Sequence, residues 1–472
     1  MALTLSVAIA VPTNPLLPLS AIITGMVILI LLIHSSFAFL YFVPLLLSLE
    51  YRVELNFISF ALGEISAVLV WLVALLQIWN NRKVYLSRSE VILVLFIATA
   101  ALPSVGLESD TRHALSVYRD LILPLVFFAG FLLIRLNRQQ VIKLLKIFVL
   151  AATASAILGI IQFKTGHYLW TMRFEDVWWQ NFKTDFIRSS MIGQLLNVKD
   201  TLPVGLYATT NNFASYLVIP AVCAFALATF PLRSRSEKLV WRMCSVTLFV
   251  ALLFTFSRGS LFTFLVACLP LVWFQSRKYV SLASMFFVIG ISVLIIAAIL
   301  VTGILSWDQL GTLQGRAMML QAGVELIKDH PEALLTGGFT EEYRTYYYQP
   351  QLAHNVALYA ILQFGLLATL GWLFLVWHNL RIMWSGIKSE NDIESKLLGM
   401  ALLSGLFATV FLYAQTTSFI DNVQSSMWLF FWIGVGRVLI HHKKFRVFQE
   451  NSCRTQRNLL AFRTGIRGEE PT

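Results

Sequence analysis

YATTNNFASYLVIPAVCAFALATF, residues 207–230, contains no charged side chain over its whole length. A helix needs about 20 predominantly apolar residues to cross the hydrocarbon core of a bilayer. Comparable uncharged runs recur at residues 147–163, 259–274, 279–306, 397–420 and 422–436. Because these runs are apolar on every face and do not alternate as strands of a membrane barrel would, each must satisfy its backbone hydrogen bonds internally. The runs therefore predict an all-α polytopic membrane protein.

The composition agrees with a chain that lies in lipid. Of its 472 residues, 57% are hydrophobic and only 13% are charged, and the mean hydropathy is +0.72. Soluble domains are about 25% charged. We expect about 12 or 13 spans, each about 20 residues long, within a single membrane domain over residues 1–440. The expected spans lie near residues 16–49 (one or two), 57–79, 90–105, 118–135, 145–163, 208–230, 240–256, 259–275, 279–304, 353–378, 397–417 and 424–440.

Lys and Arg, which give the chain a formal net charge of +11, gather in alternate loops. This pattern indicates how the chain is oriented in the membrane and does not indicate nucleic-acid binding. The basic loops follow the spans that end near residues 79, 135, 230, 275 and 378, and they predict the cytoplasmic side. A basic tail over residues 441–472 falls on the same side. Two longer loops, at residues 164–206 and 305–352, are then expected outside the cytoplasm. Long loops are where chemistry is expected, since short turns suffice to reverse the chain.

Arg258, in the sequence Ser257-Arg258-Gly259, occupies the shortest of the expected external turns. Its guanidinium would be held near the bilayer surface, on the side where positive residues are unusual. A candidate role is binding of an anion. The alternative is an interfacial arginine that extends its head to water and has no further function.

Arg316 opens the second long loop. The sequence predicts a helix that starts with Thr312 as its N-cap, has apolar residues at helical spacing from Met319 to Ile327, and stops at Pro331. Arg316 would then project from the first turn, where free N–H groups and a guanidinium both suit phosphate oxygens. The alternative is a solvated arginine on an amphipathic interfacial helix.

His354 stands where the second loop re-enters the membrane, after a tyrosine-rich stretch at residues 343–350 that includes Arg344. A neutral imidazole there could act as a general base near pH 7. A structural histidine is the alternative. Glu64 is expected in the middle of the span at residues 57–79, where an acid is a functional candidate unless it is simply paired with a neighbour.

The first long loop mixes aromatic side chains and Arg173 with carboxylates, a combination suited to stacking on sugar rings and bonding their hydroxyls. An aromatic belt on the lipid headgroups is the equal alternative. The sequence contains no phosphate-binding loop of the GxxxxGK[ST] type, and its four cysteines show no ligand spacing. We expect no cofactor, no metal site and no disulfide.

The order of these features resembles the O-antigen ligase and O-antigen polymerase superfamily. The resemblance rests on SRG at residues 257–259, GR at residues 315–316, a Gly-Gly turn at residues 337–338, HN at residues 354–355 and QFGLL at residues 363–367. TTNNFA at residues 209–214 adds to it. The similarity covers residues 205–378 well and the rest by span pattern.

The resemblance implies a metal-independent glycosyltransferase of a bacterial inner membrane, which takes a glycan from an undecaprenyl-pyrophosphate donor at the periplasmic face, where the two longer loops would lie. Carried over to this chain, it makes Arg258, Arg316 and His354 the catalytic group, with the two arginines on the diphosphate and the histidine on the acceptor hydroxyl. Arg173, Asn212, Asn355 and Arg344 are the expected substrate contacts.

The acceptor is left open among a lipid A core, a growing polysaccharide and a protein. The segment between Arg316 and His354 is short for a ligase that accepts a bulky lipid A core, so a polymerase and a protein O-oligosaccharyltransferase stay possible. An inorganic-anion transporter of the bicarbonate type is the alternative from another class. A transporter would need charged or polar positions through the membrane depth, and we expect Glu64 to be nearly the only deep one.

Overall fold

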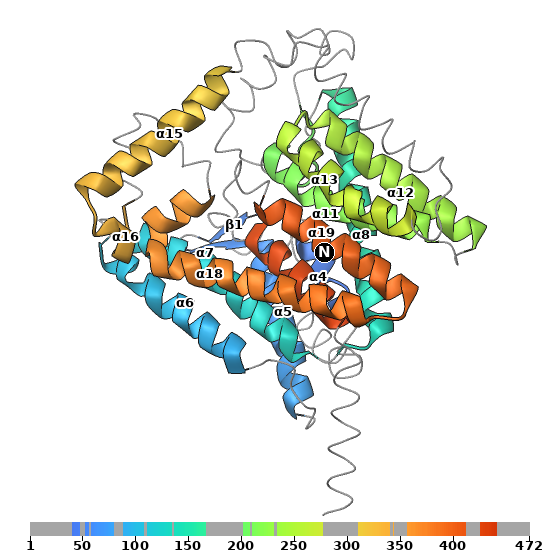
Figure 1. Ribbon diagram of the computed structural model, residues 1–472, viewed down its shortest axis with the longest axis horizontal. Helices are drawn as coiled ribbons and strands as arrows, with labels where there is room; N and C mark the ends of the chain where they lie inside the picture. The colour runs from blue at the N-terminus through green and yellow to red at the C-terminus, as the bar shows by residue number, and fades with distance from the viewer. Residues whose placement is uncertain are drawn as a thin grey trace, which may run out of the picture.

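The computed structural model of the chain describes residues 40–47, 52–55, 58–79, 88–107, 111–134, 136–166, 202–207, 210–230, 234–276, 310–339, 343, 356–411 and 425–440. Within these ranges the chain is helical apart from one short hairpin (Figure 1). The elements are α4 (Val43–Leu47), β1 (Arg52–Leu55), β2 (Ile58–Ala61), α5 (Leu62–Trp79), α6 (Arg88–Leu107), α7 (Thr111–Leu133), α8 (Arg138–Thr165), α11 (Thr210–Thr229), α12 (Arg235–Phe254), α13 (Arg258–Ser276), α15 (Leu310–Asp329), α16 (Ala333–Thr336), α18 (Val356–Ser389), α19 (Ile393–Phe411) and an unlabelled helix, Ser425–Ile440.

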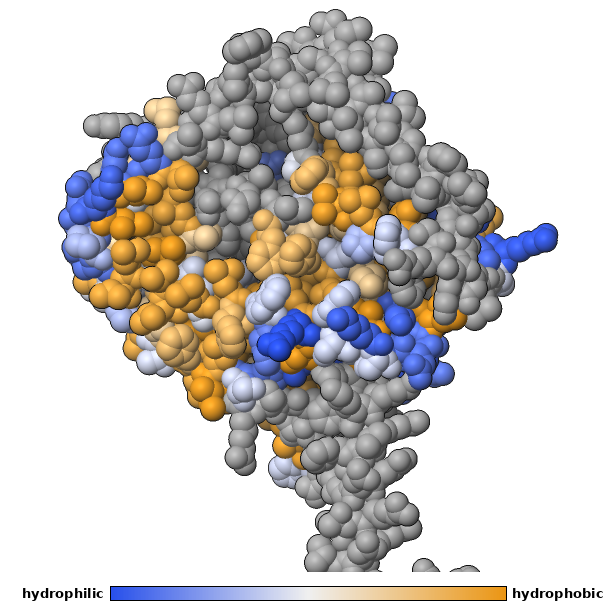
Figure 2. All heavy atoms as spheres, in the orientation of Figure 1, coloured by the Kyte–Doolittle hydropathy of each residue, from blue (hydrophilic) through white to orange (hydrophobic). Residues whose placement is uncertain are grey.

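The protein is a multi-pass membrane protein. Among the described residues, six helices are long and apolar enough to cross a bilayer, within α6, α7, α8, α11, α18 and α19. Large apolar side chains are exposed on the surface of α6 and α18, for example Leu95, Leu370 and Phe374. The left part of the face in Figure 2, where these helices lie, is mostly hydrophobic. Such a face is stable against lipid tails. The expected span at residues 279–304 and most of residues 16–49 lie outside the described residues, so the count of 12 or 13 stays a prediction.

One expected span begins differently from the prediction. Residues 52–61 form a small antiparallel hairpin in which Arg52 lies opposite Ala61, and α5 starts only at Leu62. The fold is therefore helical with a two-stranded exception, whose second strand falls inside the apolar run at residues 57–79. The correction moves Glu64 from the middle of a span to the first turn of α5.

Helix α11 lies at the centre of the bundle and packs against α8, α12, α13 and α19. Almost its whole circumference is buried. Aromatic rings fill the space beside it: Phe148 of α8 lies 4.5 Å from Trp432 and 5.7 Å from Tyr216, centroid to centroid. Close aromatic packing of this kind holds membrane helices together where lipid removes most of the hydrophobic driving force.

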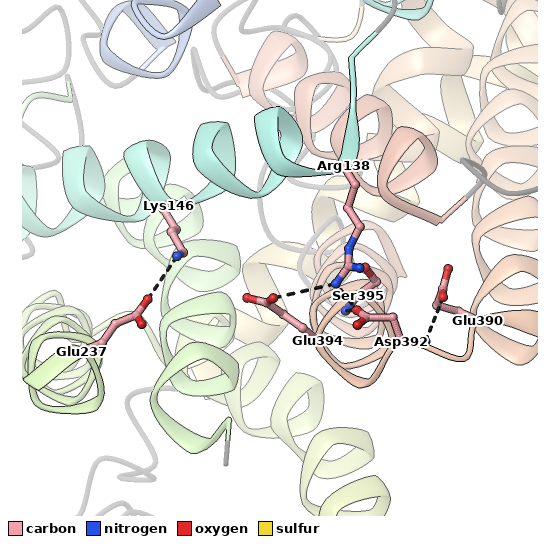
Figure 3. Close-up of polar contacts among 7 residues, drawn as sticks. All are labelled: Arg138, Lys146, Glu237, Glu390, Asp392, Glu394 and Ser395. Carbon is pink, nitrogen blue, oxygen red and sulfur yellow. Dashed lines mark hydrogen bonds and ion pairs between the residues drawn. The ribbon is translucent and has the colours of Figure 1, made fainter. Parts of the chain in front are cut away.

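Ion pairs join the helices at one end of the bundle, which we call the ion-pair end (Figure 3). Arg138, at the start of α8, pairs with Asp392 and lies 3.8 Å from Glu394, both at the start of α19. Lys146 of α8 lies 3.1 Å from Glu237 in the first turn of α12. These contacts fix α8, α12 and α19 as helices that begin at the same end.

A more buried pair lies at the same end. Arg437 of the last described helix pairs with Glu90 in the first turn of α6 and donates to Asn379 Oδ1 of α18 at 2.6 Å. Only 1% of the Glu90 side chain is exposed. Since α6, α8, α12 and α19 start at the ion-pair end and α18 finishes there, the starts of α13 and α18 lie at the opposite end, which we call the site end.

Candidate functional site

The helices that carry the candidate residues form two pairs among the described residues, because α11 packs on α13 and α15 packs on α18. Asn212 lies in the first turn of α11, and Arg258 is the first residue of α13. Arg316 lies in α15, and the structure gives the backbone of Arg258 and Arg316. His354 and Asn355 directly precede α18 in sequence, and with Arg173 and Arg344 they lie outside the described residues. The predicted roles of all seven stay predictions.

The turn that delivers Arg258 is tightly constrained. Phe256 has a left-handed backbone, with φ of 51°, which is unusual for a residue other than glycine. The Thr255 hydroxyl donates to Leu252 O at 2.7 Å and accepts from the Ser257 N–H at 3.2 Å. Ser257 Oγ lies 2.9 Å from Ser260 Oγ in the first turn of α13. The polar side chains around this turn therefore bond to the turn itself and fix where α13 begins.

Helix α15 differs from the prediction at its start. It begins at Leu310, so Thr312 lies inside the helix and is not its N-cap, and Arg316 falls in the second turn. The argument that Arg316 sits among the free N–H groups of a first turn is therefore wrong. The predicted stop is confirmed, because α15 ends at Asp329, just before Pro331.

Helix α15 packs against the first part of α18. Gly323 allows the close approach, since a Cβ on it would come within 2.6 Å of Leu358 Cδ2. The Tyr343 hydroxyl donates to Met319 O of α15 at 3.0 Å. The small core of this contact consists of Ala322, Leu326, Tyr343, Leu358, Tyr359 and Leu362. The contact thus joins the helix that carries Arg316 to the segment that follows His354.

The predicted apolar face of α15 is partly wrong. Leu320 and Val324, which were expected in the apolar face, are 48% and 43% exposed. The face that packs on α18 is formed by Met319, Ala322 and Leu326 together with Gly323. In Figure 1, α15 lies at the edge of the molecule, where its remaining sides have few neighbouring helices.

Helix α18 is broken near its start. Gly365 has φ of 81° and ψ of 166°, which interrupts the helical hydrogen bonds and leaves carbonyls without their helical partners. The N–H groups of Gly338 and Phe339 take two of these carbonyls, donating to Gln363 O at 3.1 Å and Leu362 O at 3.0 Å. We call the contact of residues 337–339 with residues 362–365 the clasp. The clasp gives the two motifs a common structural reason, because the Gly-Gly turn at residues 337–338 and QFG at residues 363–365 form its two sides.

The clasp leaves no space for side chains. A Cβ on Gly337 would lie 2.6 Å from Gln363 O, and one on Gly365 would lie 2.5 Å from Leu335 O. Gly338 also rests on the end of α6, where a Cβ would meet Ser104 O at 3.0 Å. The clasp therefore connects the loop after α15 to both α18 and α6, and it holds the start of α18 at the site end.

His330 and Glu332 form the exposed edge of this loop. His330 Nδ1 lies 3.2 Å from Glu332 Oε1. The pKa of the Glu332 carboxyl lies below its usual value, chiefly because its own backbone N–H donates to it and also because His330 bonds to it. The imidazole ring lies 5.4 Å from the Phe339 ring, so the edge packs on the clasp.

Charged residues inside the bundle were underestimated from sequence. Glu64 is buried and lies 3.6 Å from Arg119 Nη2 of α7, which also lies 3.1 Å from Asp120 Oδ1. Glu64 is thus an acid paired with an arginine across two helices. Glu64 is not alone, because Asp120 and Glu90 are also buried. The signal that could have found the pair is the sequence Arg119-Asp120 inside an otherwise apolar run.

Comparison with known families supports the resemblance. Residues 243–373 match a family model described as O-antigen ligase. The matched stretch contains Arg258, Arg316, His354 and both sides of the clasp, whereas Arg173 and Asn212 lie outside it. The match supports the O-antigen ligase superfamily and a membrane glycan ligase or polymerase kind of function. No curated protein matches the chain.

Proposed function

We propose that this chain transfers a glycan from undecaprenyl pyrophosphate to an acceptor hydroxyl at the periplasmic face of a bacterial inner membrane. The proposal starts from the family match over residues 243–373. It makes Arg258, Arg316 and His354 the catalytic residues, with Arg173, Asn212, Asn355 and Arg344 as substrate contacts. The reaction joins a saccharide either to a growing polysaccharide or to a lipid acceptor.

One structural observation carries the proposal. The clasp and the small core around Leu358 hold α15 against the start of α18, so the helix bearing Arg316 and the residue that follows Asn355 belong to one packed unit. Arg258 starts α13 at the same end of the bundle. In the proposal, these elements, which are separated by many residues in sequence, supply the cationic and imidazole groups at one membrane surface.

The chemistry needs only groups of these kinds. The imidazole of His354 takes the proton of the acceptor hydroxyl while its oxygen forms a bond to the anomeric carbon. The bond from that carbon to the diphosphate oxygen breaks, and undecaprenyl pyrophosphate leaves with the electron pair. Two guanidinium groups neutralise the charge that develops on the diphosphate, which is the usual role of preorganised cations in such transfers. The proposed mechanism therefore uses no metal.

The test is transfer by the purified full-length chain in proteoliposomes. The donor is an undecaprenyl-pyrophosphate-linked glycan, and the acceptors, in separate reactions, are a lipid A core, a free polysaccharide and a serine-containing peptide. Release of undecaprenyl pyrophosphate that depends on one acceptor is the expected result. His354→Ala, Arg316→Ala and Arg258→Ala should each lower the rate by about 10²- to 10³-fold.

The matched control is His378→Ala, which removes a histidine from the same helix, α18, on the far side of the break. Its transfer rate should equal that of the wild type. Transfer that persists in His354→Ala, or bicarbonate flux into proteoliposomes without any transfer, would contradict the proposal.

A further inference from the structure

The last turns of α8 contact two parts of the site end at once, and neither contact was expected from the sequence. Gln162 and Phe163 are consecutive residues, each 1% exposed, within the run at residues 147–163 that reads as a plain apolar span. Gly166, in a left-handed conformation, ends the helix directly after them. Their side chains lead to different segments of the chain.

Gln162 holds the segment that enters α11. Its Nε2 donates to Gly205 O at 2.9 Å, and its Oε1 accepts from the N–H groups of Val204 at 3.1 Å and Gly205 at 2.9 Å. Gly205 has φ of 58°, and a Cβ there would come within 2.4 Å of Phe213 and 2.7 Å of Ser155 Oγ. One buried amide thus satisfies three backbone groups of the turn that precedes Asn212.

Phe163 holds the segment that enters α13. Its ring stacks on Phe254 at 4.4 Å, with 23° between the planes, and lies 6.3 Å from Phe256. Phe256 is the residue with the left-handed backbone, two positions before Arg258. Leu202, from the segment that Gln162 holds, completes this small cluster. The two segments therefore rest on the same turn of α8.

We propose that Gln162 and Phe163 are positioning residues for glycan transfer, and that they set the separation between the Asn212 and Arg258 ends of the donor site. The inference rests on the proposed function, and it assigns a role to α8 that the family match, which begins at residue 243, does not cover. The interior of the bundle around position 162 is apolar, so an apolar side chain would fit there better than an amide without partners. A buried amide is tolerated only when its hydrogen bonds are made. The amide is needed because the turn that it holds is irregular backbone inside the bundle, which requires partners.

The positioning role predicts a specific kinetic defect. Gln162→Met keeps the volume and removes all three bonds, whereas Gln162→Glu keeps an acceptor for the two N–H groups and loses the donor to Gly205. We expect kcat to fall by up to about 10²-fold in Gln162→Met, which is the cost of a misplacement of about 1 Å. The fall should be smaller in Gln162→Glu, and the KM for the acceptor should not change in either variant. Phe163→Leu should resemble Gln162→Met.

Gln140→Met is the matched control. Gln140 lies at the opposite end of α8, where its side chain accepts from the Asn137 N–H at 2.8 Å in an exposed capping box. This variant removes a glutamine from the same helix, and its kcat per folded protein should equal that of the wild type. If Gln162→Met lowers only the thermal midpoint and leaves kcat per folded protein unchanged, the role is structural and the inference fails.

A distance measurement tests the inference without activity. Spin labels are placed at Asn211→Cys in α11 and Phe262→Cys in α13, both exposed, in a Cys453→Ser background where Cys223, Cys244 and Cys268 are buried. Pulsed dipolar spectroscopy should give a narrow distribution for the wild type and for Gln140→Met, and a shifted or broader one for Gln162→Met and Gln162→Glu. An unchanged distribution in the Gln162 variants overturns the inference, whereas a wild type that positions the labels but transfers no glycan overturns only the proposed function.

Discussion

The backbone N–H of Gly338 donates to the carbonyl of Gln363 at 3.1 Å, although α15 and α18 are separated in sequence by a long loop. The bond exists because Gly365 breaks α18 and frees that carbonyl from its helical partner. In the sequence, the two glycine-containing segments look like ordinary flexible turns. In the fold they contact each other. The loop after α15 and the start of α18 depend on each other.

Gly337→Ala should destabilise the protein and reduce transfer. Its left-handed φ of 66° would be strained by about 1–3 kcal/mol for a residue with a side chain. The new Cβ would also meet the Gln363 backbone at 2.6 Å, which has no flexible side chain to move aside. Thermal unfolding in detergent measures the loss. Gly106→Ala is the control, because nothing lies within 4 Å of that position and helix propensity favours alanine. An equal effect of both substitutions would show that the clasp has no special role.

Arg437→Met should cost far more than Lys146→Met, although both remove one partner of an ion pair. Arg437 removal leaves the carboxylate of Glu90 buried, which typically costs about 3–5 kcal/mol. The Lys146 pair with Glu237 is partly exposed, and such pairs contribute about 1 kcal/mol or less. Denaturant unfolding of the two variants gives the comparison. The double variant Glu90→Gln with Arg437→Met should recover part of the loss, and a further loss would contradict this account.

Arg316→Lys and Arg258→Lys should separate charge from geometry. Lysine keeps one positive charge and loses the planar fork that matches two phosphate oxygens. If the guanidinium groups grip a diphosphate, each substitution should lower kcat/KM for the donor by at least about tenfold, close to the alanine variants. The measurement is initial rate against donor concentration. Full activity in both lysine variants would mean that charge alone is required, and that the diphosphate is not held by two bonds to each arginine.

Thiol labelling should place the two ends of the bundle on opposite sides of the membrane. In the Cys453→Ser background, Asn211→Cys should react with an impermeant maleimide added outside spheroplasts. Lys396→Cys, at the ion-pair end next to Asp392, should react only after the membrane is opened. Cys223, Cys244 and Cys268 are buried in helices and should not contribute. The reverse pattern would place Arg258 in the cytoplasm and remove the basis of the proposed donor.

The sequence predicts the helices well, but it predicts poorly where they start and how the chain turns between them. Residues 207–230 are apolar on every face, so α11 could hardly be anything else, and Thr210 begins it as TTNNFA suggests. The hairpin at residues 52–61 was missed because its second strand, ISFA, is as apolar as the span that follows it, and its first strand, RVEL, is too short to stand out as a strand. The displacement of Glu64 from mid-span to the first turn follows from that one error. Local periodicity does not contain the information that a short segment turns back on itself.

The sequence suggested candidate site residues by their type, but it did not predict the contacts that hold the surrounding segments in place. Charged and imidazole groups at span ends are visible in a sequence, and Arg258 does start a helix at the site end. Backbone hydrogen bonds such as those of Gly338 and Phe339 have no side-chain signature, and Gln162 is a single polar residue in an apolar run. The partnership of Arg138 with Asp392, 254 positions apart, is likewise set by packing. Long-range contacts were the part that sequence patterns could not supply.

The break at Gly365 divides α18 into a short outer part and a long inner part, and the two parts have different contacts. The short outer part packs on α15 and the clasp, whereas the long inner part is bonded to α6 and the last helix through Asn379, Arg437 and Glu90. Each part is therefore anchored independently, so a substitution in the clasp should weaken the outer part and leave the contacts of the inner part in place.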